Sequence, residues 1–305
     1  MKVILLGPQR TPTLGGVVEA LELPGPIATV TAGWQEREPA DDELNELLAG
    51  RGVNLGLYQR WLDVQTRDPE YAAAVRMQRE LLDEVQELYL VRLDYAMRSA
   101  YDVQHRPSSE RLRDDALAEA MEAVRDLDAR HLDRLGHLHG EFYRSWPPHE
   151  RPVIDEHRTA VAALMRDAAA VVVTGGHVGV LVEVLHTFNV ASSLGPLVIA
   201  WSAGAMALTD RIVLFHDRAP QGPGHAEIYG SGLSLLRGVV PLPHARHRLM
   251  LDDAARMSLF AHRFAPARCV VLESGSRVDL ESDGTFPPNV QVLGADGRVV
   301  SSVAA

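Results

Sequence analysis

The sequence contains very little cysteine and no excess of basic charge, and each shortage excludes a class of protein. Cys269 is the single cysteine among 305 residues, so no internal disulfide forms, and the residues around it do not suggest a metal site. Lysine and arginine number 30 against 41 aspartate and glutamate residues, a formal net charge of −11. Without a basic face to neutralise phosphates, nucleic acid is not an expected partner.

Long apolar runs are missing as well. No segment approaches the roughly 20 consecutive apolar residues of a membrane-spanning helix. The first ten residues, MKVILLGPQR, hold an apolar run that is too short for a secretory signal and predict a first strand instead. We therefore expect a cytoplasmic protein that needs no membrane, and nothing in the sequence indicates a cofactor or a metal.

Short apolar runs alternate with amphipathic segments over two parts of the chain. This rhythm predicts an α/β fold: a doubly wound, mostly parallel sheet with helices on both faces. Ligands of such sheets bind beyond the carboxyl ends of the strands. The predicted strands cover residues 3–6, 26–31, 170–174, 197–200, 212–215, 239–240 and 269–272, with a final hairpin between about residues 289 and 303.

Between about Asp41 and Trp146 the strand signal almost disappears, and apolar residues recur at helical spacing. The α/β domain is therefore predicted over residues 1–40 and 147–305, and a helical insertion over residues 41–146. The segment 88–93 is apolar on more than one side of its helix. This pattern favours either a cap over the site or an interface in a homodimer. Three histidines of the insertion, His131, His137 and His139, are predicted to lie on the surface.

The stretch LVIAWSAGAMALTD, residues 197–210, holds the first chemical signal. A buried strand ends there at Ser202, which small residues surround. A sharp strand-to-helix turn of this kind exposes a serine hydroxyl as a nucleophile, and it requires small neighbours. The N–H of Ala203 would then be one donor to an oxyanion. The same pattern would also arise if Ser202 only capped the following helix.

A second oxyanion donor has to come from a neighbouring strand end. Gly175 and Gly176 follow the strand at residues 170–174, and glycines allow a ligand to approach the backbone closely. His177 comes next and is a candidate to line the pocket. A plain turn would also explain the two glycines, but their place at the preceding strand end favours a functional role.

These two stretches, VVVTGGHVGVL and IAWSAGAMAL, resemble the glycine-rich strand end and the nucleophile turn of the serine peptidases of the dipeptidase E and cyanophycinase type. The resemblance is specific over roughly residues 171–208, and it does not cover the helical insertion. It implies a fold like that of the class I glutamine amidotransferases. Those enzymes use a cysteine in this turn, whereas this chain has Ser202, so glutamine amidotransfer by that mechanism is disfavoured.

The base is expected to be a histidine at the end of a later strand. His244, in VVPLPHARHRLML, directly follows one, and His247 is its rival. The resemblance implies a catalytic histidine in such a segment, followed by arginines that correspond to Arg246 and Arg248. A carboxylate has to orient the imidazole. Asp217, at the end of the next strand after Ser202, is preferred, and Glu273 is the competitor, since the family has an acid in a similar place.

The predicted activity is that of a serine hydrolase which cleaves a small peptide or amide through an acyl-enzyme. The family's substrates carry a carboxylate near the cleaved bond, so cleavage at an acidic residue is implied, with Arg246, Arg248 and Arg256 as candidate carboxylate ligands. Two alternatives remain open. One is an α/β-hydrolase-like esterase, because Ser202, Asp217 and His244 follow one another in the order that such enzymes have. The other is a non-catalytic binding or scaffold protein of the same fold.

Overall fold

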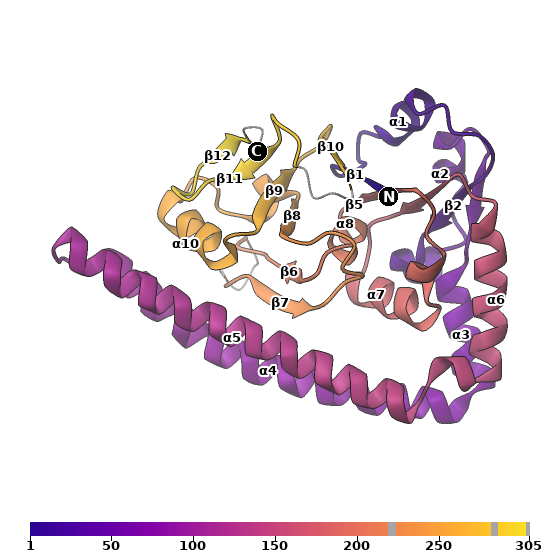
Figure 1. Ribbon diagram of the computed structural model, residues 1–305, viewed down its shortest axis with the longest axis horizontal. Coiled ribbons are helices and arrows are strands. Elements are labelled where there is room, and N and C mark those ends of the chain that lie inside the picture. Colours follow the sequence, from indigo (N-terminus) through magenta and orange to yellow (C-terminus); the bar gives the residue numbers. More distant parts are fainter. Residues whose placement is uncertain (219–223, 282–285, 303–305) are drawn as a thin grey trace.

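The computed structural model describes residues 1–218, 224–281 and 286–302, and a six-stranded sheet forms its centre (Figure 1). Five strands run parallel, and the sixth, β10, is antiparallel to its neighbour β1. The strands in sheet order are β10 (Arg277–Leu280), β1 (Lys2–Leu6), β5 (Leu197–Trp201), β4 (Ala170–Val173), β2 (Ile27–Val30) and β3 (Gly52–Asn54). The predicted mixed α/β fold with a mostly parallel sheet is confirmed.

Helices cover both faces of this sheet, which explains the uninterrupted apolar runs of its strands. In β1, Ile4 and Leu6 pack on one face with α1 (Leu14–Ala20) and α2 (Asp42–Leu47). Val3 and Leu5 point to the other face, where the helices are α3 (Leu57–Arg67), α6 (Pro152–Arg166) and α7 (Val178–Thr187). Since both faces are buried, the carboxyl edge of the sheet is the place where polar side chains meet solvent.

Apart from β10, the strands after residue 211 do not continue the central sheet, contrary to the prediction. β8 (Val239–Pro243) and β9 (Arg268–Leu272) pair in parallel in a second sheet, which β11 (Gln291–Leu293) and β12 (Val299–Ser301) complete. β11 and β12 form the predicted final hairpin, although residue 303 lies outside the described residues. β6 (Ile212–Leu214) and β7 (Glu227–Gly230) form a separate antiparallel pair.

The segment predicted as a helical insertion is divided between two structures. Its first part belongs to the central body, because β3 pairs with β2 at the edge of the sheet and α3 packs beneath it. The remainder is a hairpin of two long helices, α4 (Pro69–His105) and α5 (Glu110–Ser145), which runs along the body and extends beyond the second sheet (Figure 1). Among helices in the described part of the chain, none combines the length and the apolar composition needed to cross a bilayer.

A buried ion pair attaches this hairpin to the second sheet's helix α10 (Ala254–Phe264). The Arg263 guanidinium donates two hydrogen bonds to the Asp128 carboxylate, at 2.7 and 2.8 Å, and one to the Tyr89 hydroxyl at 2.9 Å. It also donates to the Ala226 carbonyl. Arg263 is 3 % exposed and Asp128 is 5 % exposed. Because water does not reach the guanidinium, these hydrogen bonds take the place of its hydration and stabilise its charge.

The prediction that His131 lies on the surface is wrong. It is 4 % exposed, its ring stacks on Tyr89 with centroids 3.9 Å apart, and its Nε2 lies 2.8 Å from Gln86 Oε1. Burial lowers the pKa of His131, which keeps the ring neutral. His139 is half-buried against Gln78, whereas His137 is exposed as predicted.

We expect Asp128→Asn to lower the free energy of unfolding by about 3–5 kcal/mol, because it leaves the Arg263 charge buried without its counter-ion. Asp126→Asn is the matched control: it lies on the same helix, and its pair with Arg130 is 3.8 Å long and exposed. Urea unfolding followed by circular dichroism measures both. Equal stability of the two variants would show that the ion pair does not hold the hairpin.

Candidate active site

Ser202 occupies a strained turn at the carboxyl edge of the central sheet. β5 ends at Trp201 and the short helix α8 (Ala203–Ala207) begins at the next residue. Ser202 has φ 50° and ψ −123°, a left-handed conformation that costs a non-glycine residue about 1–3 kcal/mol. It is half-buried between the buried side chains of Trp201 and Ala203. The turn therefore brings the hydroxyl out of a row of buried residues.

Close backbone packing between the ends of β4 and β5 explains the small residues around Ser202. A Cβ on Gly204 would overlap the Val173 carbonyl oxygen and lie 2.6 Å from that of Thr174. A Cβ on Gly175 would lie 3.0 Å from Ser202 Cβ and 3.6 Å from Ser202 Oγ. Gly175 therefore lies against the Ser202 side chain, and Ala203 begins α8 directly after the serine. That Ala203 and Gly175 or Gly176 donate N–H groups to an oxyanion stays a prediction.

His244 enters from the second sheet. It follows β8, is half-buried, and donates its backbone N–H to the Leu272 carbonyl at 3.1 Å. Burial lowers the pKa of His244 below its usual 6.5, and the nearby charges of Arg248 and Arg10 lower it further, while Glu273 acts in the opposite direction. The ring is therefore neutral near pH 7, which is the form a general base requires.

Glu273 lies beside His244 at the end of the neighbouring strand β9. Its Oε1 accepts a hydrogen bond from the Arg246 N–H at 2.7 Å, and its backbone oxygen packs against Gly7 directly after β1. β1 pairs with β5, with Leu6 opposite Trp201. The second sheet thus brings His244 and Glu273 to the edge that holds Ser202. Within the described residues no hydrogen bond joins the Ser202 hydroxyl to an imidazole; such bonds often tighten only when substrate binds.

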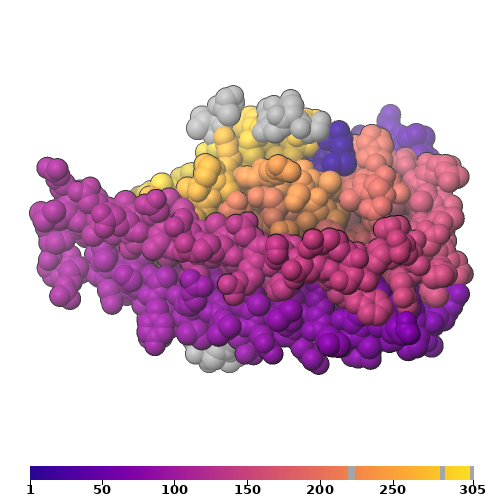
Figure 2. All heavy atoms as spheres, turned by 60° about the horizontal axis from the view of Figure 1, so that its bottom comes forward, coloured from indigo at the N-terminus to yellow at the C-terminus, as the bar shows by residue number. Residues whose placement is uncertain are grey.

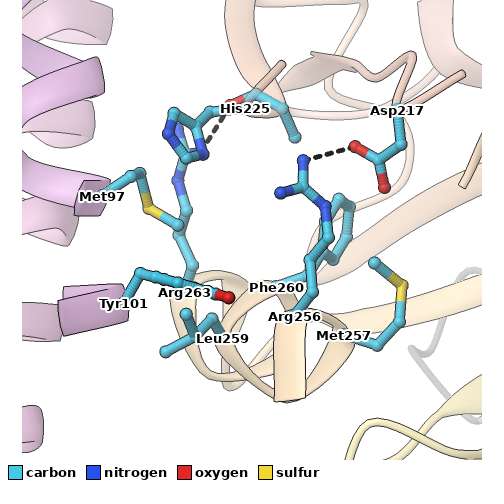
Figure 3. Close-up of a pocket in the computed structure, with 10 residues that line it drawn as sticks. Met97, Tyr101, Asp217, His225, Arg256, Met257, Leu259, Phe260 and Arg263 are labelled. Carbon is cyan, nitrogen blue, oxygen red and sulfur yellow. Dashed lines mark hydrogen bonds and ion pairs between the residues drawn. The ribbon is translucent and has the colours of Figure 1, made fainter. Parts of the chain in front are cut away.

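Asp217, the acid preferred from the sequence, is bound to other partners. Its carboxylate accepts hydrogen bonds from the Arg256 guanidinium at 2.6 Å and from the Met250 N–H at 3.2 Å. Figure 3 shows this pair lining a pocket between α4 and α10, with Met97 on the α4 side. Asp217 and Arg256 therefore stabilise each other, and Glu273 is the acid whose charge acts on His244.

The remaining predicted residues lie around the rim. His177 is exposed and accepts a hydrogen bond from the Val180 N–H through Nδ1, so it caps α7. Arg246, Arg248 and the rival histidine His247 are exposed on the short helix α9 (Ala245–Arg248). Arg248 is the one of these arginines whose charge lowers the pKa of His244.

Two further residues near this edge are not among the predicted site residues. Arg10 follows β1, and its charge lowers the pKa of His244. Its position just after a strand end is the sequence signal that could have marked it as a site residue. Gln35 follows β2 and has φ 57° and ψ −124°, almost the conformation of Ser202. It lies two residues after Gly33, whose carbonyl accepts a hydrogen bond from the His177 N–H. Strained backbone gathers at functional sites, but no sequence pattern marks it.

The thiol of Cys269 is not suited to act as the nucleophile. Cys269 is buried in β9, and burial raises the pKa of its thiol to about 12, so it is protonated and not a nucleophile. In residues 1–218, 224–281 and 286–302, histidine, cysteine and carboxylate side chains nowhere gather in groups of three or more that would suit a metal ion.

Comparisons with known proteins give a likeness in structure but none in sequence. No family model matches the chain, and no curated protein matches it in sequence. The structure is similar to the crystal structure of a peptidase from an acI-B1 Actinobacterium, with a TM-score of 0.45 and 12 % identity. The alignment covers 99 % of this chain and 94 % of that one.

We expect Gly204→Ala to lower the free energy of unfolding by about 1–3 kcal/mol, because its methyl group meets backbone that has no room to move. Gly136→Ala in α5 is the matched control: nothing lies within 4 Å of its Cβ, and alanine in a helix interior stabilises by about 1 kcal/mol. Thermal unfolding compares the two. A Gly204 variant as stable as wild type would contradict the close approach of β4 and β5.

Proposed function

We propose that the chain is a serine-nucleophile hydrolase that cleaves a small peptide or isopeptide through an acyl-enzyme. The observation that carries this proposal is the backbone at Ser202: a strained, positive-φ serine between two buried residues, with Gly175 packed against its side chain. Capping the five-residue helix α8 does not require this strain, and the Ser202 side chain makes no capping hydrogen bond to α8.

In this proposal the site residues divide the steps of acyl transfer among them. The Ser202 oxygen attacks the scissile carbonyl carbon while His244 takes the hydroxyl proton. The N–H groups of Ala203 and of Gly175 or Gly176 stabilise the oxyanion. His244 then protonates the leaving amine as the C–N bond breaks. Water attacks the acyl ester, giving its proton to His244, which returns it to the serine oxygen. Glu273 stabilises the imidazolium that forms in both steps.

The motifs around Gly175 and Ser202 support membership of the dipeptidase E and cyanophycinase type, with its glutamine amidotransferase-like fold. Positive charge surrounds the site: Arg10 and Arg248 both act on His244, and Arg246 is exposed beside them. A substrate with an acidic residue at the cleaved bond fits this charge, since guanidinium groups bind carboxylates well. A cytoplasmic location fits the single, buried thiol of Cys269.

A fluorophosphonate probe tests the nucleophile directly. We expect wild type and Ser99→Ala, which alters an exposed serine on the regular helix α4, to be labelled, and Ser202→Ala to remain unlabelled. Intact-protein mass spectrometry measures the adduct. If folded wild type and Ser202→Ala label equally, the serine mechanism fails and a scaffold is favoured. Aspartyl dipeptides, β-aspartyl dipeptides and simple esters then separate peptidase from esterase.

The pH dependence of kcat/KM identifies the acid. Because the pKa of His244 lies below 6.5, activity should rise with pH through an apparent pKa below that value. Glu273→Gln removes a charge that raises this pKa, so the rising limb should move to lower pH, with the rate reduced roughly 10²-fold or more.

Asp217→Asn is the matched comparison. We expect it to reduce stability without moving the pH profile, since its carboxylate binds Arg256. A profile that moves with Asp217→Asn and stays in place with Glu273→Gln would reverse the roles of the two acids.

A further inference from the structure

Exposed large hydrophobic side chains are concentrated on helix α4. In the described part of the chain, thirteen large hydrophobic side chains are exposed, and seven of them belong to α4. Single exposed apolar residues are ordinary, but a contiguous group marks an interaction surface. Figure 2 shows α4 as a purple ridge along one face, with α5 beside it in magenta.

Five of the seven follow a heptad pattern along α4, and we call them the α4 seam. Taking Leu81 as position a, all five exposed apolar residues fall at a or d positions, and Glu84 and Arg98 occupy the remaining d positions on this side of the helix. Apolar residues at a and d are typical of a helix that packs against another helix. The seam consists of Met77 (71 % exposed), Leu81 (44 %), Leu88 (64 %), Val91 (58 %) and Tyr95 (71 %).

The described part of the chain leaves the α4 seam exposed. The opposite side of α4 holds the buried residues that pack against α5 and the body, among them Val75, Tyr89, Leu93 and Met97. At 3.6 residues per turn, Leu88 and Leu93 lie roughly 140° apart around the helix. α4 is therefore apolar on two sides, and the described residues cover only one of them.

We propose that the α4 seam is the interface of a homodimer, in which α4 packs against α4 of a second copy. A single patch that is apolar along one helix can pair with itself around a two-fold axis. The seam spans roughly 27 Å, and its five side chains expose on the order of 500 Å² of surface. With its flanking residues this approaches the roughly 800 Å² per partner that a stable interface buries.

The two charged residues at d positions favour an antiparallel pairing. In a parallel pair, Glu84 would face Glu84 of the second copy, and Arg98 would face Arg98. An antiparallel pair centred near residue 90 places Leu88 against Val91 of the second copy and brings Glu84 near Arg98 of that copy. Arg98 now pairs with Asp94 in an exposed i,i+4 contact at 2.9 Å, which contributes little and is easily exchanged.

Analytical ultracentrifugation over a concentration series tests the dimer. We expect wild type to approach twice the chain mass of 33.4 kDa, and a double variant, Leu88→Glu with Val91→Glu, to be a folded monomer. Leu112→Glu is the matched control: Leu112 is 66 % exposed on α5, outside the seam, so this variant should remain a dimer. A wild type that stays monomeric, or a double variant that still dimerises, would overturn the proposal. Circular dichroism confirms that each variant is folded.

A short thiol cross-linker tests the orientation, because the native Cys269 is buried. Leu88→Cys lies near the two-fold axis and should cross-link, whereas Met77→Cys should not, since its two copies would be roughly 39 Å apart in an antiparallel pair. Cross-linking at both positions would overturn the antiparallel arrangement in favour of a parallel one. Neither experiment depends on catalysis, so loss of the dimer and loss of the serine mechanism are distinguishable.

Discussion

The close approach of β4 and β5 at their carboxyl ends is the constraint on which the candidate site depends. Gly204 lies against the carbonyl oxygens of Val173 and Thr174, and Gly175 lies against the Ser202 side chain. Side chains at either glycine would separate the two strand ends. Because the backbones meet here, the chain after β5 has to turn sharply, and Ser202 adopts a conformation that residues other than glycine seldom adopt. Backbone packing, rather than any hydrogen bond of the serine, presents its hydroxyl.

The partners proposed for Ser202, His244 and Glu273, come from a different sheet. β8 and β9 end at His244 and Glu273, and the turn after β9 is fastened to the end of β1 by a 2.8 Å hydrogen bond from the Gly7 N–H to the Ser276 carbonyl. The distance between nucleophile and base thus depends on how firmly the two sheets hold together.

Much of the central body was predictable from sequence because its strands are apolar on both faces and end in glycine or serine. The turn at Ser202 and the glycines before His177 follow from such local patterns. Long-range partners do not. Spacing from Ser202 favoured Asp217, and nothing local shows that Arg256, 39 residues later, takes that carboxylate. Helical periodicity likewise places His131 on the polar face of its helix, but it does not reveal that Tyr89 packs over that face. The division into two sheets was missed because a run of strands does not state which of them pair.

The ion pair between α5 and α10 also bears on how the chain is made. Asp128 and Arg263 are 135 positions apart, and the Tyr89 hydroxyl precedes its guanidinium partner by 174. As a ribosome extends the chain, the long hairpin emerges well before the residue that neutralises its inward-facing carboxylate. Until α10 is synthesised, the face of α5 that carries Asp128 is more stable in water than packed against the body. The hairpin therefore packs on the body late in folding. Separating the two afterwards leaves the charges of Asp128 and Arg263 without their partners, which is unfavourable.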